Sequence, residues 1–331
     1  MRAFVIDGYK KPLHEADVPE PTVGPNDVLI AVAAAGLNSL DERIRVGDFK
    51  VFLPYRPPFT LGHDVAGTVI RVGAQVRSFS PGDEVFSRPR DHRIGTFAER
   101  IAVDQADVAR VPSSIDLVEA ASLPLVALTA WQALVEKGGV KAGQKVLIHG
   151  GAGGVGTIAI QLAKHLGAEV ATTASAKNAE FVRSLGADVV IDYARQDFSA
   201  ELSGYDFVLD SLGGENLAKS LRVLRPGGMA VGIAGPPTPA FARQIGLNPV
   251  LRLVTGALSS KVNAQAKKLG VTYEFLFMRA DGEQLRKIAD LVDAGAIRPI
   301  VGATSPFDDA PKALESLHRG GIRGKSVLRG A

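Results

Sequence analysis

Apolar runs alternate with amphipathic stretches through the second half of the chain, from about Ser114 onward. The run KVLIH at 145–149 is short and apolar, which predicts a buried strand. From Val155 to Leu166 the apolar positions recur at steps of three and one, so they share one face of a helix. Gly167 follows, in a position where glycine commonly ends a helix. A strand followed by such a helix is the unit that builds a parallel sheet.

The same alternation continues toward the C-terminus. Further helices are expected at 178–185, 250–269 and 281–294. The predicted strands lie at 145–149, 169–173, 189–191, 207–210, 229–233 and 272–277. Six strands in one run are enough for a complete doubly wound parallel sheet, so the pattern predicts an α/β domain of the Rossmann type.

The first part of the chain has a different pattern of residues, with short β-branched runs and turn sequences. Residues 27–32 and 67–72 are rich in β-branched side chains and predict short strands, and 81–83 (PGD) is typical turn sequence. No long helical period is visible before Pro112. After Gly295 the sequence again has a pattern typical of short strands. We therefore expect β-rich segments at both ends of the chain.

Composition narrows the class of protein. At ~150 residues per domain, 331 residues suggest two domains, and 46% hydrophobic residues with a mean hydropathy of +0.12 indicate a packed globular protein. The net charge is +3, and the basic residues are scattered, so we expect no nucleic-acid partner. The absence of cysteine excludes disulfides, thiolate nucleophiles and cysteine-ligated metals.

The N-terminus and the longest uncharged run indicate the cellular compartment. Asp7 interrupts the start of the chain before an apolar signal segment could form. The run at 146–163 holds five glycines, a histidine and a glutamine, so it fits a glycine-rich turn better than a membrane helix. We expect a cytoplasmic protein with no membrane partner.

A glycine-rich motif follows the predicted strand at 145–149. Gly151, Gly153 and Gly156 have the spacing G-x-G-x-x-G, and the motif opens the next helix. Glycine lets the backbone approach a pyrophosphate, whose charge is met by free N–H groups at a helix N-terminus. The motif predicts a dinucleotide site in which Gly153, Gly154 and Val155 contact the pyrophosphate. A glycine-rich turn without a ligand is the alternative.

The choice of dinucleotide is predicted from the end of the next strand. An acidic residue about 20 positions on would hold the ribose 2′-hydroxyl of NAD. This chain has Ser175 and Lys177 there, which suit the 2′-phosphate of NADP(H). Tyr193 could add its hydroxyl to the same phosphate. The alternatives are a solvated lysine and a tyrosine buried in the core.

Several motifs together resemble the medium-chain dehydrogenase/reductase superfamily, and within it the zinc-free quinone oxidoreductases and enone reductases. These motifs are GHDVAGTV at 62–69, PGDEV at 81–85, EAASLP at 119–124, the glycine motif at 150–156, TAS at 173–175, GAD at 186–188, IDY at 191–193, LVDAG at 291–295 and GK at 324–325. The resemblance runs the length of the chain.

The resemblance implies a fold and an assembly. It implies a split, β-rich GroES-like domain at 1–117 and 280–331, and a Rossmann domain at 118–279. Nicotinamide is expected in a cleft between them. The apolar segment 271–278 comes last in the sheet, and the resemblance implies a homodimer formed by joining these strands from two chains.

The resemblance also implies site residues. Zinc dehydrogenases of this superfamily hold their catalytic metal with two cysteines and a histidine; here only His63 remains, and Asn38 stands at the first cysteine position. One ligand cannot hold zinc, so we expect no metal site and a buried, hydrogen-bonded His63. Asn38 is the first catalytic candidate, near the nicotinamide or the acceptor oxygen, unless it only satisfies buried backbone. Tyr55, in an apolar loop, is the second. The residues expected at the nicotinamide are Thr129, Ile233, Ala234, Phe275 and Phe277.

These features lead to one function and two alternatives. We expect NADPH-dependent, zinc-independent hydride transfer to a small quinone or α,β-unsaturated carbonyl, because such an acceptor spreads the arriving charge onto an oxygen that hydrogen bonds can stabilise. An NADPH-binding structural or regulatory protein would not consume NADPH with any acceptor. An alcohol dehydrogenase-like enzyme would need a Lewis acid, and hence zinc in the purified protein.

Overall fold

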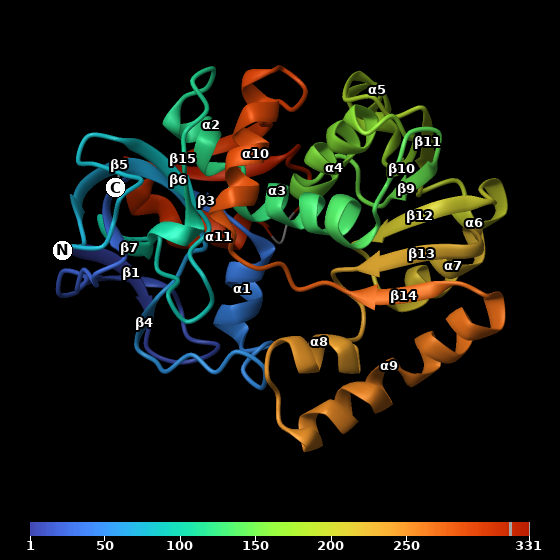
Figure 1. The fold of residues 1–331 in the computed structure, drawn as a ribbon, viewed down its shortest axis with the longest axis horizontal. Helices are drawn as coiled ribbons and strands as arrows, with labels where there is room; N and C mark the ends of the chain where they lie inside the picture. Colours follow the sequence, from blue (N-terminus) through green and yellow to red (C-terminus); the bar gives the residue numbers. More distant parts are fainter. Residues whose placement is uncertain (318–319, 331) are drawn as a thin grey trace. The chain divides into compact units, whose positions relative to one another are not determined.

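The computed structural model describes residues 1–317 and 320–330, and the chain divides into two compact units (Figure 1). One unit is Met1–Leu128 together with Arg279–Ala331, and the other is Thr129–Met278. The division therefore comes after Leu128, later than the expected boundary at residue 117. The reason is that helix α2 (Leu117–Ala121) packs against strands of the N-terminal unit.

The unit Thr129–Met278 is built on a six-stranded sheet in which all neighbouring strands are parallel. The strand order is β11-β10-β9-β12-β13-β14, the doubly wound order of a Rossmann fold. All six predicted strands are present: β9 (Lys145–Ile148), β10 (Glu169–Ala174), β11 (Val189–Asp192), β12 (Tyr205–Asp210), β13 (Leu224–Gly232) and β14 (Thr272–Phe275). The strand order reverses at β9, which has β10 on one side and β12 on the other.

The helices of this unit follow the predicted pattern. The predicted helices at 155–166, 178–185 and 250–269 correspond to α4, α5 and α9. Their bounds, with those of the remaining helical elements, are the π-helix η2 (Gln132–Lys137), α4 (Gly154–His165), η3 (Ala176–Asn178), α5 (Ala179–Ser184), α6 (Phe198–Glu201), α7 (Gly214–Val223), α8 (Pro239–Gln244) and α9 (Pro249–Leu269).

The other unit is β-rich, and both ends of the chain contribute to it, as expected. Its larger sheet has the order β15-β16-β3-β5-β6-β8, with β7 also paired to β3, and a smaller sheet has the order β2-β1-β4. The C-terminal strand β16 runs antiparallel to β3, with Leu328 opposite Ala35. The strands are β1 (Arg2–Ile6), β2 (His14–Asp17), β3 (Asp27–Leu37), β4 (Phe59–Thr60), β5 (Asp64–Val72), β6 (Glu84–Ser87), β7 (Arg100–Asp104), β8 (Val108–Arg110), β15 (Val301–Pro306) and β16 (Lys325–Arg329).

Short helices complete this unit. The predicted helix at 281–294 is α10 (Gly282–Asp293), whereas α1 (Ser39–Val46) was not predicted. α1 begins because the Asp41 carboxylate accepts the backbone N–H of Asn38 at 2.7 Å, and it ends at Gly47 with φ 86°. Its few apolar residues give no visible helical period. The others are η1 (Gln105–Asp107), η4 (Phe307–Asp309) and α11 (Ala310–Ser316). The division after Leu128 falls within α3 (Pro124–Trp131).

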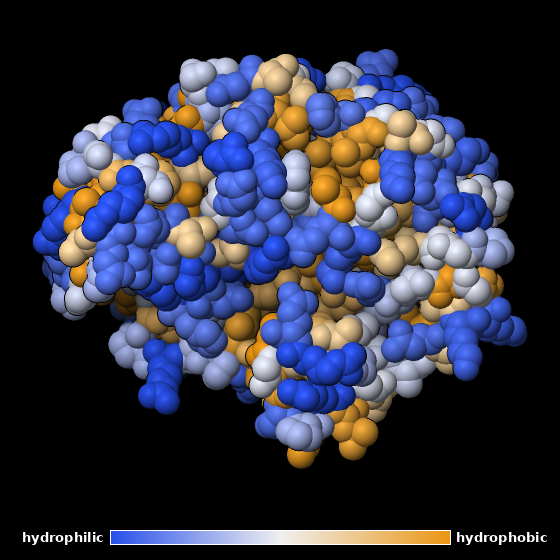
Figure 2. Space-filling model, viewed as in Figure 1, coloured by the Kyte–Doolittle hydropathy of each residue, from blue (hydrophilic) through white to orange (hydrophobic). Residues whose placement is uncertain are grey.

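The face of the molecule in Figure 2 is mostly hydrophilic, with apolar residues gathered at a few places. None of the helices in the described part of the chain is long and apolar enough to cross a membrane.

A buried polar network lies at the carboxyl end of β9. The two ring nitrogens of His149 lie 3.2 Å from the Thr173 hydroxyl and 2.9 Å from the Ser220 hydroxyl. Ser220 donates to the Asp210 carboxylate at 2.8 Å, and the Thr173 hydroxyl accepts the N–H of Gly150 at 3.1 Å. A neutral imidazole satisfies all of these groups. The network therefore holds the start of the glycine-rich loop.

Burial lowers the pKa of His149 below its ordinary value, and the charge of Asp210 opposes this effect only in part. Below about pH 6.5 the unfolded chain then binds more protons than the folded one at this site. The free energy of unfolding therefore falls as the pH is lowered through this range, by at most about 1.4 kcal/mol per pH unit for this residue.

We predict that His149→Gln reduces the loss of stability between pH 7.5 and pH 5.5, measured as the midpoint of urea denaturation. His14→Gln is the control. The Glu15 carbonyl and the Asp7 carboxylate raise the pKa of His14, so His14 contributes with the opposite sign and its removal should not reduce the acid sensitivity. Full acid sensitivity in His149→Gln would contradict the assignment.

Candidate active site

The glycine-rich loop joins β9 to α4 at the carboxyl edge of the parallel sheet, where the strand order reverses. A Cβ on Gly151 would lie 2.2 Å from the Thr172 hydroxyl oxygen, and a Cβ on Gly156 would lie 2.2 Å from the Gly150 carbonyl oxygen. Neither position has room for a side chain. The two glycines therefore let the loop and the first turn of α4 pack closely, as a dinucleotide site requires.

The N-terminus of α4 carries no side-chain cap. Gly153 is the N-cap residue, so no side chain of its own covers the amides of Gly154 and Val155 in the first turn. Such a terminus has a partial positive charge and free N–H donors. A Cβ on Gly153 would lie 3.3 Å from the Gly150 carbonyl oxygen, a tighter contact than most Cβ atoms make. The residues present thus fit a dinucleotide pyrophosphate, with Gly154 and Val155 as its donors, whereas the N–H of the predicted Gly153 already donates to the Gly150 carbonyl at 2.9 Å.

The residues predicted to select NADP(H) lie together at the ends of two neighbouring strands. Ser175 follows β10 and is the N-cap of η3, and Lys177 is exposed within η3. Tyr193 follows β11, in which Asp192 pairs with Ala174. Tyr193 is 65% exposed, so it is not the core tyrosine of the alternative interpretation. The structure brings a hydroxyl, an ammonium and a phenol to one corner of the sheet.

Four of the five residues expected at the nicotinamide lie at the ends of β13 and β14, at the same edge of the sheet. Ile233 is half-buried and Ala234 exposed, directly after β13. The Gly232 carbonyl accepts the N–H of Leu276, which joins this segment to the one after β14. Phe275 and Phe277 direct their rings onto Phe241, at 5.0 and 6.2 Å between ring centroids. Their side chains thus belong to the core, consistent with the expected backbone role. Thr129 is buried in α3.

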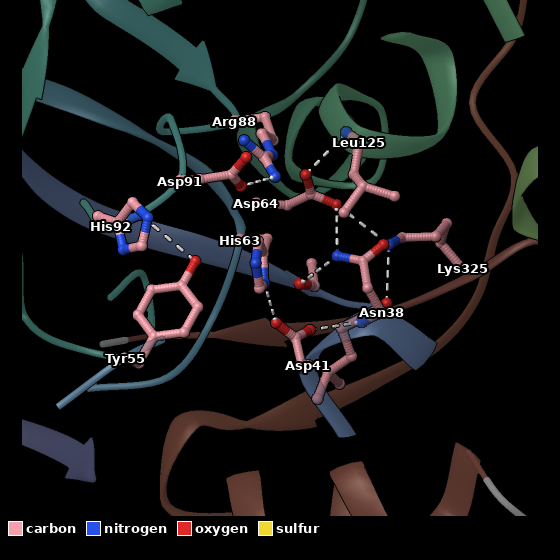
Figure 3. Close-up of polar contacts among 12 residues, drawn as sticks. Asn38, Asp41, Tyr55, His63, Asp64, Arg88, Asp91, His92, Leu125 and Lys325 are labelled. Atoms are coloured by element: carbon pink, nitrogen blue, oxygen red, sulfur yellow. Dashed lines mark hydrogen bonds and ion pairs between the residues drawn. The ribbon is translucent and has the colours of Figure 1, made fainter. Parts of the chain in front are cut away.

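Asn38 lies at the end of β3 in a cluster of buried polar side chains (Figure 3). Its amide nitrogen donates to Asp64 Oδ2 at 2.9 Å and lies 3.4 Å from the Gly36 carbonyl oxygen. Its amide oxygen accepts a hydrogen bond from Lys325 Nζ. The same ammonium donates to the Leu37 carbonyl at 2.7 Å and to Asp64 Oδ2 at 3.1 Å. All three ammonium hydrogens of Lys325 therefore have acceptors.

The strand register explains how this cluster forms. β3 lies between β5 and β16, with Gly36 opposite Asp64 on one side and Leu37 opposite Ser326 on the other. A Cβ on Gly36 would lie 2.3 Å from the carbonyl oxygen of Ala121, so only glycine fits this crossing. The second oxygen of Asp64 accepts the N–H of Leu125 at 2.8 Å. Both oxygens of the carboxylate are thus satisfied.

His63 pairs with Asp41 beside this cluster (Figure 3). Nδ1 of His63 lies 2.5 Å from Asp41 Oδ1, and both side chains have no exposed surface. His63 is therefore buried and hydrogen-bonded, as expected. Within residues 1–317 and 320–330, its Nε2 has no hydrogen-bond partner, and no group of three His, Cys, Asp or Glu side chains could hold a metal ion.

Tyr55 lies in the apolar loop and is 8% exposed. Its ring stacks on Phe59 at 5.1 Å, and its hydroxyl accepts the N–H of His92 at 3.4 Å. Burial, together with the charge of Asp91, raises the pKa of Tyr55 well above its ordinary value. The phenol therefore stays protonated at neutral pH and remains a hydrogen-bond donor.

Sequence reasoning missed Asp41, Asp64 and Lys325 as site residues. Asp64 and Lys325 stand within the motifs GHDVAGTV and GK that carried the resemblance. Their separation along the chain gave no sign that they meet. One signal in the sequence could have pointed to them: a charged residue stands within a β-rich motif that is otherwise apolar. A buried charge is rare unless it is paired, so such a residue indicates a buried partner elsewhere in the chain.

Two family models match the chain: "Alcohol dehydrogenase GroES-like domain" over residues 24–113 and "Zinc-binding dehydrogenase" over residues 185–328. The mouse NAD(P)H oxidoreductase RTN4IP1, mitochondrial, is 37% identical, over 99% of this chain and 89% of its own length. The Arabidopsis thaliana NADPH-dependent alkenal/one oxidoreductase, chloroplastic, is 34% identical, over 93% of this chain and 74% of its own.

Solved structures agree with these relatives. The quinone oxidoreductase from Coxiella burnetii is similar at a TM-score of 0.86 with 31% identity, covering 100% of this chain and 99% of its own. The similarity covers both units, including the glycine-rich loop and the C-terminal strand that brings in Lys325. The chain therefore belongs to the medium-chain dehydrogenase/reductase superfamily of oxidoreductases, with the zinc-free quinone and enone reductases as its relatives.

Proposed function

We propose that this protein transfers a hydride from NADPH to a quinone or an α,β-unsaturated carbonyl without a metal. The observation that carries the proposal is the glycine-rich loop at the switch point of the sheet, with Ser175, Lys177 and Tyr193 at the neighbouring strand ends. The relatives support the acceptor class, because one is named an alkenal/one oxidoreductase and another a quinone oxidoreductase.

NADPH, when bound, supplies the hydride. The amides of Gly154 and Val155 hold the pyrophosphate, and Ser175 and Lys177 hold the 2′-phosphate. Hydride arrival places negative charge on the acceptor oxygen, which requires a donor directed at it. Asn38 is the proposed donor: one amide hydrogen goes to Asp64, and the other makes only the long 3.4 Å contact with Gly36. Lys325 fixes the orientation of that amide by holding its oxygen.

A second donor is available in Tyr55, whose raised pKa keeps its hydrogen in place. A redox-silent NADPH-binding protein and an alcohol dehydrogenase-like enzyme are the other functions we considered. The similarity to oxidoreductases over the whole chain favours an enzyme, and the lack of cysteine ligands favours a metal-free one. The cytoplasmic location stays a prediction, since the mouse and Arabidopsis relatives are named mitochondrial and chloroplastic.

A screen of NADPH consumption against quinones and enones, with identification of the products, tests the proposal. Reduction of the carbon–carbon double bond identifies an enone reductase, and formation of a quinol identifies a quinone reductase. No turnover with either class would leave only a cofactor-binding protein and contradict the proposal.

We predict at least a tenfold preference for NADPH over NADH in kcat/KM, because a charge-assisted pair with the 2′-phosphate contributes about 1.5–3 kcal/mol. Lys177→Ala should remove most of this preference and spare turnover with NADH. Lys141→Ala, at another exposed lysine, should leave the preference unchanged. Equal use of both cofactors by the unaltered enzyme would refute the assignment of Ser175 and Lys177.

We predict that Asn38→Ala lowers kcat by about 10²-fold or more, because it removes a donor directed at developing negative charge. The affinity for NADPH should stay within a few-fold, since the cofactor phosphates are held elsewhere. Thermal denaturation of the same variant separates a structural effect. Unchanged kcat with a lower melting temperature would make Asn38 a structural residue, and would assign the polarisation of the acceptor to another donor.

The homodimer also remains a prediction. β14 is the last strand of its sheet, so one edge of it carries ladder groups open to another chain. Two copies that joined these edges would form one continuous sheet. Analytical ultracentrifugation at micromolar concentration should give the mass of two chains. A monomer under these conditions would contradict the prediction.

A further inference from the structure

Helix α9 exposes large apolar side chains along its N-terminal half. Val250, Leu253, Val254 and Leu258 are 70%, 77%, 45% and 55% exposed, and they account for four of the eight large apolar residues exposed in the described part of the chain. Their spacing of three, four and eight residues places them on one face of the helix. This face, called here the α9 ridge, is a continuous apolar strip rather than scattered surface residues.

The ridge points away from the protein's own core. The fully buried residues of α9 are Thr255, Ser259 and Ala266, which are small, and the partly buried Val262 and Leu269 of its second half pack against the core. The Thr255 and Ser259 hydroxyls donate within the helix, to the carbonyls of Arg252 and Thr255, both at 2.8 Å. An amphipathic helix normally turns its large apolar side chains inward. Here the four of the ridge face outward, so packing of the core does not explain them.

The charged side chains of α9 have one sign. The helix contains no acidic residue and four basic ones: Arg252, Lys261, Lys267 and Lys268. Of the basic residues that precede it in the chain, Lys219 and Arg225 are paired with Asp197 and Asp206. By helical geometry, Lys261 and Lys268 share the face of Val250 and Val254. The outward face of α9 is therefore apolar over its first half and basic over its second.

We propose that the α9 ridge docks on an anionic lipid surface, with the helix lying in the plane of the interface. A basic helix with an exposed apolar face is the type that binds there, with its apolar side chains among the acyl chains and its lysines at the headgroups. Figure 1 shows α9 on the outer side of its unit, next to β14, and Figure 2 shows apolar atoms near the place where α9 begins. The proposal departs from our expectation of no membrane partner, which considered only spanning segments.

A second copy fits this surface less well. Two α9 ridges that met would bring two basic helices together, with no acidic residue of α9 to offset them. The predicted dimer pairs the edges of β14, and although α9 packs against β14, that strand pairing does not itself use the ridge. An acidic protein would match the charge but needs a groove shaped to a projecting ridge, whereas a fluid lipid layer adapts to it.

Docking has a consequence that rests on the proposed function. A quinone with a long alkyl tail dissolves in the bilayer, and an enzyme held at the interface meets it there. Such a quinone in vesicles should be reduced faster by the docked protein, while a short, water-soluble quinone should be reduced equally well with or without vesicles.

Vesicle sedimentation tests the docking itself. The full chain should bind vesicles with 30% phosphatidylserine at least tenfold more strongly than pure phosphatidylcholine vesicles, and 0.5 M NaCl should remove most of the difference. Leu253→Ser with Val254→Ser, and separately Lys268→Glu, should each weaken binding at least tenfold. The matched controls, Val51→Ser and Lys141→Glu, change exposed residues outside α9 and should bind as the unaltered chain does.

The outcomes separate the possible occupants. No binding to the anionic vesicles, or binding that the α9 variants retain, overturns the proposal. A change from dimer to monomer in Leu253→Ser with Val254→Ser, without vesicle binding by the unaltered chain, assigns the ridge to a second copy and also overturns it. Activity with the water-soluble quinone is measured on the same samples, so a loss of that activity tests the proposed function and not the docking.

Discussion

Lys325 and Asp64 form an ion pair from which water is almost excluded, since their side chains are only 6% and 0% exposed. Removing one partner of such a pair leaves an uncompensated buried charge and typically costs about 3–5 kcal/mol. That is a large part of the about 5–15 kcal/mol by which a domain is stable. The pair therefore constrains everything around it: the charge of Lys325 can stay in the core only while Asp64, Asn38 and the Leu37 carbonyl surround it.

This constraint ties the chemistry to the architecture of the β-rich unit. Lys325 stands on the C-terminal strand, Asp64 on β5 and Asn38 at the end of β3, so three strands meet at one cluster. The cluster also orients the Asn38 amide, at the position where the resemblance implies a zinc-binding cysteine in metal-dependent members of the superfamily. In the proposed mechanism a positioned amide takes over the role of a Lewis acid, and the buried lysine contributes by holding it.

The Rossmann unit meets a different physical requirement. Its cofactor carries phosphates, so the chain presents backbone N–H groups and small residues rather than buried charges. The glycines let the backbone come close to the phosphates. The hydrogen bonds of the network around His149 hold the start of the glycine-rich loop in place. In α9 the same unit has large apolar side chains that its own core does not use. An outward apolar ridge on a basic helix is the kind of surface that serves a partner, and a lipid interface satisfies both of its features.

Hydrophobic periodicity determined much of this protein directly. The six strands of the parallel sheet, the helices α4, α5, α9 and α10, and the glycine-rich loop follow from local patterns, because a buried strand and an amphipathic helix each have their own period. The same local reasoning placed Ser175, Lys177 and Tyr193 at neighbouring strand ends. It missed α1, whose start depends on one carboxylate and whose apolar residues show no period.

Only the tertiary structure decided what depends on contacts between distant parts of the chain. No local pattern shows that Lys325 meets Asn38 and Asp64, since strand pairing and not sequence distance brings them together. The same holds for the His149 network and for the direction of the α9 ridge. A helical period shows that apolar side chains share a face, but only the packing of the helix decides whether that face turns to the core or to the outside.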